Sequence, residues 1–136
     1  MAFVHGKDTV FKLDNSAGTL TDLSIYVTSS GLPREVDTHE VTAYGKSAKV
    51  YIAGLSDATI PLEGKWDATL DAHMNGIVGG VSRSWEWGPE GNASGKVKYS
   101  GECFLTSYES EAPVDGEVTW SADMQVTDTI TRGTWP

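Results

Sequence analysis

The sequence has a single cysteine, Cys103, so it can form neither an internal disulfide nor a zinc site built from several cysteines. The neighbours of Cys103 have the composition of a strand, which favours a small buried hydrophobic residue over a reactive thiol. No apolar run approaches the roughly 20 residues that a membrane-spanning helix needs. The first residues also lack an apolar stretch long enough for a secretory signal. We therefore expect no membrane association and a chain that is made and used in a cytoplasm.

Basic residues are also scarce, because 10 Lys and Arg stand against 19 Asp and Glu, for a formal net charge of −9. Proteins that grip nucleic acid concentrate Lys and Arg against the anionic phosphate backbone. The composition therefore argues against tight binding of nucleic acid. Two interpretations stay open: the charge maintains solubility, or it forms a surface past which DNA moves without sticking.

The short motifs that mark catalytic and metal sites are absent from the sequence. The three histidines, His5, His39 and His73, lie far apart and lack a second ligand at a recognised spacing. No serine occupies a G-x-S-x-G turn, and the glycines of segment 76–80 lack the Lys-Ser/Thr that completes a phosphate-binding loop. Pairs of carboxylates are expected by chance among so many acidic residues. We therefore predict no enzyme activity, no metal site and no cofactor.

Alternation of apolar and polar residues is the strongest pattern that the sequence does contain, and it is clearest in segment 118–127. The apolar positions are Val118, Trp120, Ala122, Met124 and Val126, and the polar positions are Thr119, Ser121, Asp123, Gln125 and Thr127. A period of two is typical of an antiparallel strand with one face buried and the other exposed.

Several other segments have the pattern of strands. Segment 58–66 alternates in the same way, and the remaining candidates are 10–13, 23–27, 49–55, 82–87 and 96–108. Pro61 lies within one of these strands and cannot donate to a ladder, so we expect an edge position or a bulge there. Trp66 and Trp120 fall on apolar faces and are predicted to lie in the core.

One segment, 67–77, has a helical pattern instead. Its apolar residues follow the spacing i, i+4, i+7 and are Leu70, Met74 and Ile77. Asp67 suits the N-cap, and Gly76 with the glycines after it offers a stop. We therefore predict a mostly-β fold, an antiparallel β-sandwich or barrel with one short α-helix, formed as a single domain over residues 1–136.

Segment 29–47 is poor in large apolar residues and rich in charge. Its titratable residues are Arg34, Glu35, Asp37, His39 and Glu40. A long charged excursion from a small domain is either a mobile loop or an arm that folds against a partner. We predict the second, an arm between subunits.

Five tryptophans are many for a chain of this length. Exposed tryptophans on a β-sandwich can form a platform for sugars, so a carbohydrate-binding module is the alternative function. Trp135 lies next to the last residue, where a large aromatic side chain is retained if it packs on something. A neighbouring subunit is one such partner.

Three stretches of the sequence form a pattern of turns and strands that is known from one family. The first is VTAYGKSAKVYIAGLSDAT (41–59) with EGKWD (63–67), and the second is PVDGEVTWSADMQVT (113–127) with TRG (131–133). The third is segment 6–14, near the start of the chain. Together they resemble the major tail (tail-tube) proteins of long-tailed, non-contractile bacteriophages. Segment 80–108 contributes nothing specific to the resemblance.

The resemblance implies a structural virion protein with no catalytic residues. Subunits of this kind form hexameric rings in which each contributes four strands to a continuous barrel around a bore. The rings stack into a tube, together with other tail proteins, and double-stranded DNA passes through it without specific binding. The resemblance also implies a place in the virion tail after assembly in the host cytoplasm. The sequence departs from some members of the family at its end, because it stops at Pro136, and we expect no appended surface domain of the kind that those members carry.

In such a ring we predict that the polar face of segment 117–127 lines the bore. The residues concerned are Thr119, Ser121, Asp123 and Gln125. Because the apolar face must enter the core of the subunit, period-two geometry directs these side chains the other way, which is toward the lumen for an inner strand. The alternative is a strand in the outer layer whose polar face meets solvent.

Overall fold

The computed structural model describes residues 6–136 and contains a mostly-β fold with one α-helix, as predicted. In chain order the elements are η1 (Gly6–Asp8), β1 (Val10–Asp14), β2 (Leu20–Asp22), η2 (Ser24–Tyr26), β3 (Val27–Ser30), β4 (Arg34–Glu40), β5 (Tyr51–Lys65), α1 (Ala68–Ile77), β6 (Arg83–Gly88), β7 (Val97–Glu111) and β8 (Thr119–Thr134). Across the described residues, no helix combines the length and the apolar character that a membrane crossing requires.

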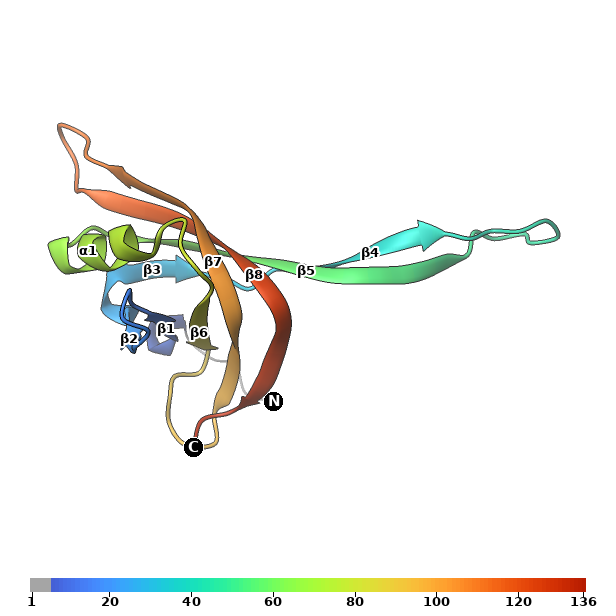
Figure 1. Ribbon diagram of the computed structural model, residues 1–136, viewed down its shortest axis with the longest axis horizontal. Coiled ribbons are helices and arrows are strands. Elements are labelled where there is room, and N and C mark those ends of the chain that lie inside the picture. Colours follow the sequence, from blue (N-terminus) through green and yellow to red (C-terminus); the bar gives the residue numbers. More distant parts are fainter. Residues whose placement is uncertain (1–5) are drawn as a thin grey trace.

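All the strands belong to one antiparallel sheet. Its order is β2-β1-β6-β7-β8-β5-β3, and β4 pairs with the part of β5 that lies beyond β3. The sheet curls into a half-barrel, and β5 and β4 leave the curl together as a long projection (Figure 1). A single curled sheet therefore takes the place of the two separate sheets of a sandwich.

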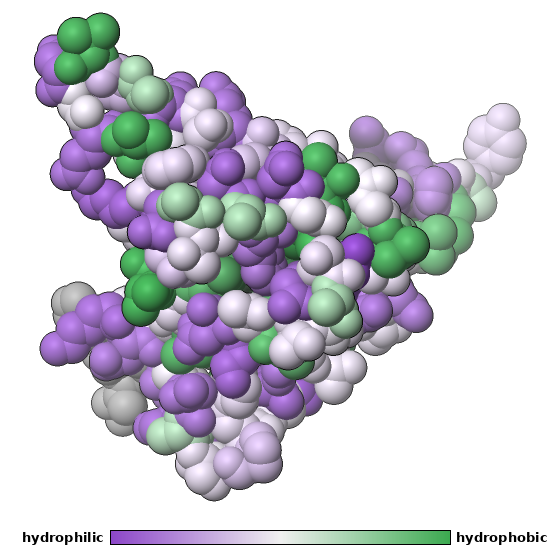
Figure 2. All heavy atoms as spheres, turned by 60° about the vertical axis from the view of Figure 1, so that its left-hand side comes forward, coloured by the Kyte–Doolittle hydropathy of each residue, from purple (hydrophilic) through white to green (hydrophobic). Residues whose placement is uncertain are grey.

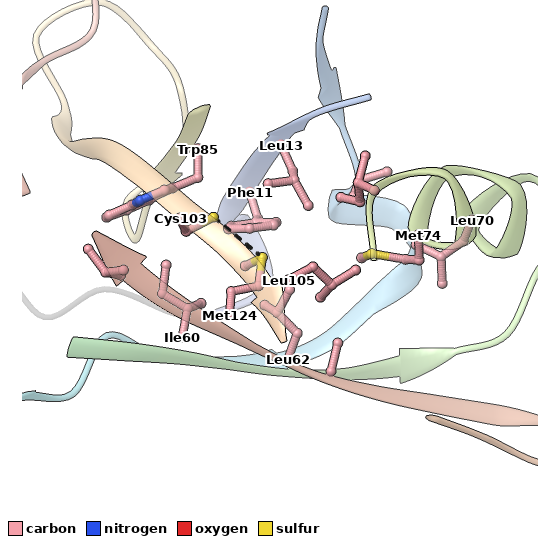
Figure 3. Packing of buried hydrophobic residues seen from close by; sticks show 14 of the residues in the cluster. Phe11, Leu13, Ile60, Leu62, Leu70, Met74, Trp85, Cys103, Leu105 and Met124 are labelled. Atoms are coloured by element: carbon pink, nitrogen blue, oxygen red, sulfur yellow. Dashed lines mark hydrogen bonds between the residues drawn. The ribbon is translucent and has the colours of Figure 1, made fainter. Parts of the chain in front are cut away.

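The core fills the concave side of the curl. Figure 3 shows Phe11 and Leu13 of β1 facing Ile60 of β5 and Met124 of β8, with Met74 of α1 closing one end. Each of these side chains is at most 2% exposed. Burial of such side chains contributes about 1.5–3 kcal/mol each, so this concave side provides most of the driving force for folding.

The predicted alternation in β8 is confirmed from its second residue onward. The buried positions are Trp120, Ala122, Met124 and Val126. The prediction that Trp66 lies in the core is wrong, because β5 ends at Lys65 and the Trp66 side chain is 37% exposed. Val118 is also exposed, since it precedes the first residue of β8.

The strand predicted for segment 23–27 is wrong as well. A 3-10 turn, η2, occupies its centre, and Ile25 is 83% exposed. Short polar side chains hold this turn: Ser24 N donates to Asp22 Oδ1 at 2.9 Å, and Phe11 N donates to Ser24 Oγ at 3.0 Å. Such local bonds compete with a ladder, and they override a brief alternation of apolar residues.

Pro61 lies in the middle of the sheet and not at an edge. It stands opposite Asp123 of β8. On its other side, pairing with β3 ends at Leu62, and pairing with β4 begins at Ala58. The missing N–H therefore falls in the gap between two partner strands, where no ladder bond is required of it.

The helix forms as predicted. Asp67 is the N-cap, and its side chain accepts a hydrogen bond from Thr69 N at 2.8 Å. Tyr108 of β7 donates its hydroxyl to Asp71 at 2.8 Å, which ties the exposed flank of the helix to the sheet. Burial and the neighbouring Asp71 raise the pKa of Tyr108 to about 12.

The buried face of α1 generates a first test. We expect Met74→Asp to lower the free energy of unfolding by about 3–5 kcal/mol, because the Met74 side chain is 0% exposed and a carboxylate there has no partner. Ala72→Asp, on the exposed side of the same helix, is the matched control and should change little. Urea unfolding of both variants measures the difference, and equal stabilities would show that the helix does not pack as described.

Gly64 generates a second test. A Cβ at this position would lie 1.7 Å from the Tyr26 carbonyl oxygen, which already accepts a hydrogen bond from Trp120 Nε1 at 3.1 Å. We expect Gly64→Ala to cost about 3 kcal/mol or more in the free energy of unfolding. Gly133→Ala is the control in strand β8, because a Cβ there meets nothing within 4 Å. A Gly64→Ala subunit as stable as this control would contradict the close packing of Tyr26, the last residue of η2, against β5.

Candidate assembly surfaces

The four residues predicted to line a bore share one face of β8, on the side away from the core. Asp123 is exposed, and Thr119, Ser121 and Gln125 are half-buried. Strand pairing extends this face onto β5 and β7, and we call the resulting surface the outer face. Its members are Thr59, Pro61, Glu63 and Lys65 of β5, Phe104, Ser107, Glu109 and Glu111 of β7, and Thr119, Ser121, Asp123 and Gln125 of β8.

Sequence reasoning missed the contribution of β7 to this face. The β7–β8 ladder shifts register between Leu105 and Ser107, and Thr106 Oγ1 donates to the Asp123 carbonyl at 3.1 Å within this bulge. One extra residue exchanges the two faces of a strand, so the alternation in the sequence of β7 is broken at that point. The pairing of Glu109 with Ser121 and of Glu111 with Thr119 is visible only in the structure.

The outer face is acidic. Its carboxylates are Glu63, Glu109, Glu111 and Asp123, and its one cation is Lys65. Lys65 is already engaged in an ion pair with Glu117, which lies at the end of the same surface. Hydroxyl groups fill most of the remaining positions, so the surface offers little that attracts a phosphate.

Gln125 has a structural role on this face. Its Nε2 donates to the Ala58 carbonyl at 3.1 Å and to Asp57 Oδ1 at 2.5 Å, and Thr59 Oγ1 donates to its Oε1 at 3.4 Å. These bonds hold the side chain against the point where β5 leaves the body of the subunit. Asp123, which makes no such bond through its carboxylate, is the exposed member of the predicted set.

The predicted arm is an ordered β-hairpin. β4 pairs with the first half of β5, from Arg34 opposite Ala58 to Glu40 opposite Tyr51, and the hairpin projects far from the body (Figure 1). We call residues 34–58 the arm and residues 41–50 the arm tip. The predicted segment 29–47 covered only one strand of this hairpin, because segment 49–55 reads as an ordinary strand in the sequence.

The arm is exposed along nearly its whole length, apart from the half-buried Gly54 and the buried Ala58 at its root. The predicted residues Glu35, Asp37, His39 and Glu40 are all exposed, and Arg34 places its guanidinium 5.2 Å from the centre of the Tyr99 ring at the root of the arm. Large apolar side chains are exposed as well, namely Val36, Val41, Tyr44, Val50, Tyr51, Ile52 and Leu55. A monomeric protein seldom exposes so many together, which points to a surface that a partner covers.

Trp135 packs on its own chain. The Trp135 side chain is 6% exposed, and the ammonium groups of Lys12 and Lys98 lie 5.1 and 5.2 Å from its ring centre. Lys98 also forms an ion pair with Glu86 at 3.0 Å. The C-terminal segment is therefore fastened to β1, β6 and β7 of the same subunit, and the burial of Trp135 needs no neighbouring subunit.

The tryptophans do not form a platform for sugars. Trp85, Trp120 and Trp135 are buried, and Trp87 is half-buried with its Nε1 donating to Ser30 Oγ at 3.1 Å, which leaves Trp66 as the one exposed tryptophan of the described residues. A carbohydrate-binding module requires exposed aromatic faces, so this arrangement argues against the alternative function.

The cysteine and the histidines of the described residues do not form a catalytic or metal site. Cys103 is buried with its sulfur 3.8 Å from that of Met124, and burial raises the pKa of its thiol to about 12. Burial lowers the pKa of His73, His39 lies on the arm, and His5 is outside the described residues. Within residues 6–136, no three His, Cys, Asp or Glu side chains gather into a group that holds a metal ion.

Known structures share this fold at low sequence identity. A chain of the virion of a native gene transfer agent particle superimposes with a TM-score of 0.80 at 19% identity, covering 97% of this chain and 100% of that one. A chain from the tail of an empty gene transfer agent particle gives 0.76 at 16% identity over 97% and 100%. The SPP1 tail tube gives 0.73 at 15% identity over 97% and 80%.

The family of the chain is assigned from its sequence. A comparison with curated protein sequences finds no match. Residues 3–132 match the model of a family described as phage tail tube protein, which spans nearly the whole chain. The chain therefore belongs to the phage tail tube protein family and is a structural component of a virion tail.

Proposed function

We propose that the chain assembles into hexameric rings that stack into a tail tube, and that the outer face lines its bore. The observation that carries the proposal is the polar, acidic surface that three adjacent long strands present on the side away from the core. The gene transfer agent tail with a similar fold has C6 symmetry, which supports a ring of six.

The free edges of the sheet support closure into a ring. β6 pairs with β7 only as far as Cys103, and in the part of the chain that the structure describes no strand covers the same edge of β7 beyond Leu105. β3 likewise pairs with β5 alone. Pairing the distal edge of β7 with the β3 of the next subunit satisfies both edges and places β3, β5, β8 and β7 in a continuous barrel.

The size of such a barrel suits its cargo. Six subunits with four strands each give about 24 strands, which at about 4.8 Å spacing and a tilt of roughly 40° have a circumference of about 150 Å. The backbone diameter is then about 48 Å, which leaves room for duplex DNA after side chains are added. Repeated carboxylates around the bore repel phosphates, so DNA passes without binding.

In this proposal the arm makes the contacts that hold copies together. Its exposed apolar side chains become buried when the arm lies against another subunit. Rings form and stack in the host cytoplasm, where other tail proteins join them, and the finished tube is part of the virion tail.

The bore assignment predicts a change of DNA binding in Asp123→Lys. The substitution places a positive charge on the outer face of every subunit, so tubes should retain short duplex DNA at low salt and release it as salt rises. Unmodified tubes and tubes of Asp8→Lys, which changes an exposed carboxylate in η1, should bind none. If the Asp123→Lys tubes fail to bind DNA at low salt, the outer face does not line the bore.

The arm predicts a variant that folds but does not assemble. Because Glu40 stands opposite Tyr51 at the end of the ladder, the arm tip can be replaced by the two-residue turn Asn-Gly without altering the register. We expect an unchanged urea midpoint, because the removed residues are exposed, and no tubes in negative-stain micrographs. If this shortened chain forms normal tubes, the arm tip is not required for assembly.

A further inference from the structure

We propose that the arm tip of one subunit docks on the far end of the β7–β8 hairpin, residues 109–118, of another copy. We call these residues the hairpin end. The inference rests on the proposed assembly and adds the surface that receives the arm. It follows from charge, from exposed apolar side chains and from the positions of the two ends.

The arm tip is basic in an otherwise acidic chain. It contains Lys46 and Lys49 and no Asp or Glu, whereas the chain as a whole has a net charge of −9. Every residue of the tip is exposed. Two cations at the end of a long projection are therefore free to meet a negative surface.

The hairpin end has the opposite charge. It contains Glu109, Glu111, Asp115 and Glu117 and no Lys or Arg, and all its residues are exposed. Glu109 and Glu111 are also the last members of the outer face on β7, so the hairpin end and the outer face meet there. Lys65 of the same subunit pairs with Glu117 alone. Among the described residues no cation pairs with the other three carboxylates, so this end attracts a positive surface from outside.

Both ends also expose apolar side chains. Tyr44 on the arm tip and Val114 on the hairpin end are each 107% exposed, and Val41, Val50 and Val118 flank them. In Figure 2 hydrophobic residues mark the outer end of the β7–β8 hairpin and the part of the arm nearest the body. An apolar centre with charged residues around it is the usual composition of a specific contact between proteins.

The contact must join different copies. The arm tip and the hairpin end lie at opposite extremes of the subunit, so they cannot meet within one chain (Figure 1). A contact between two unlike surfaces is heterologous and repeats from copy to copy, whereas a contact between like surfaces stops at two. A repeating contact is what a ring or a stack of rings requires.

Charge reversal tests the pairing in a chain that assembles. Lys46→Glu with Lys49→Glu should raise the protein concentration needed for tubes at least tenfold at low salt, without a change in the urea midpoint. Adding Glu111→Lys and Asp115→Lys to the same chain should restore assembly, because the two ends are again complementary. Lys96→Glu with Arg132→Glu makes the same change of charge at exposed positions elsewhere and should assemble normally.

Three results would overturn the proposal. The arm-reversed chain assembles like the unmodified chain; the added Glu111→Lys and Asp115→Lys fail to restore assembly; or restoration comes instead from Glu63→Lys with Asp123→Lys, which would place the arm tip on the part of the outer face that lies outside the hairpin end. The attraction should also weaken at high salt, since the screening length falls from about 10 Å at 0.1 M to about 3 Å at 1 M.

A cross-link tests the contact independently of tube formation. Subunits with Ser47→Cys, on the arm tip, are mixed with subunits with Ala112→Cys, on the hairpin end, and oxidised. We expect a disulfide-linked dimer of the two, and none when the second cysteine is at Ser94, an exposed position in another loop. The native Cys103 is buried and does not interfere. A cross-link without tubes would contradict hexameric assembly but keep the docking, whereas equal yields with both partners would contradict the docking.

Discussion

The length of three strands relative to the size of the core is the constraint on which the rest of the structure depends. β5 and β7 have 15 residues each and β8 has 16, so each extends about 50 Å. A domain of this size has a radius of gyration near 14 Å, and its core reaches only part of each strand. The arm, the hairpin end and the unpaired edges are the parts of these strands that the core leaves uncovered. Burial drives folding in the middle of the strands, and association between copies is left to their ends.

The role of the charged residues depends on where they lie on the fold. A net charge of −9 spread evenly would serve solubility alone. Instead, carboxylates such as Asp123 and Glu109 lie on the outer face, while Lys46 and Lys49 lie together on the arm tip. In the proposed docking, the opposite charges at the two ends of the molecule orient copies head to tail before any apolar contact forms, and like charges disfavour the reverse arrangement.

Sequence reasoning succeeded where a local pattern and the core agree. Trp120 is buried because a period of two is the geometry of a strand, and Asp67 caps α1 because its side chain accepts a hydrogen bond from Thr69 N in the first turn. It failed where a contact distant in sequence decides the outcome. Ile25 is exposed because Ser24 accepts a hydrogen bond from β1. The place of Glu109 on the outer face was not predicted, because a bulge exchanges the two faces of β7. The second strand of the arm was missed for the same reason, since only the register with β4 distinguishes it from a strand of the core.

The free edges also determine which copies can pair. The open edge of β7 carries Glu109 and Glu111, and the exposed strand β4 carries Glu35, Asp37 and Glu40. Pairing β7 with β7, or β7 with β4, brings carboxylates of two copies together, and like charges directly opposite each other destabilise a strand pair. The segment Val27–Ser30 of β3 has no charged residue, so pairing β7 with β3 meets no such repulsion. Acidic edges protect the free subunit from unspecific sheet extension, and they leave open the pairing of β7 with β3, which in the proposed assembly closes a ring with its polar face inward.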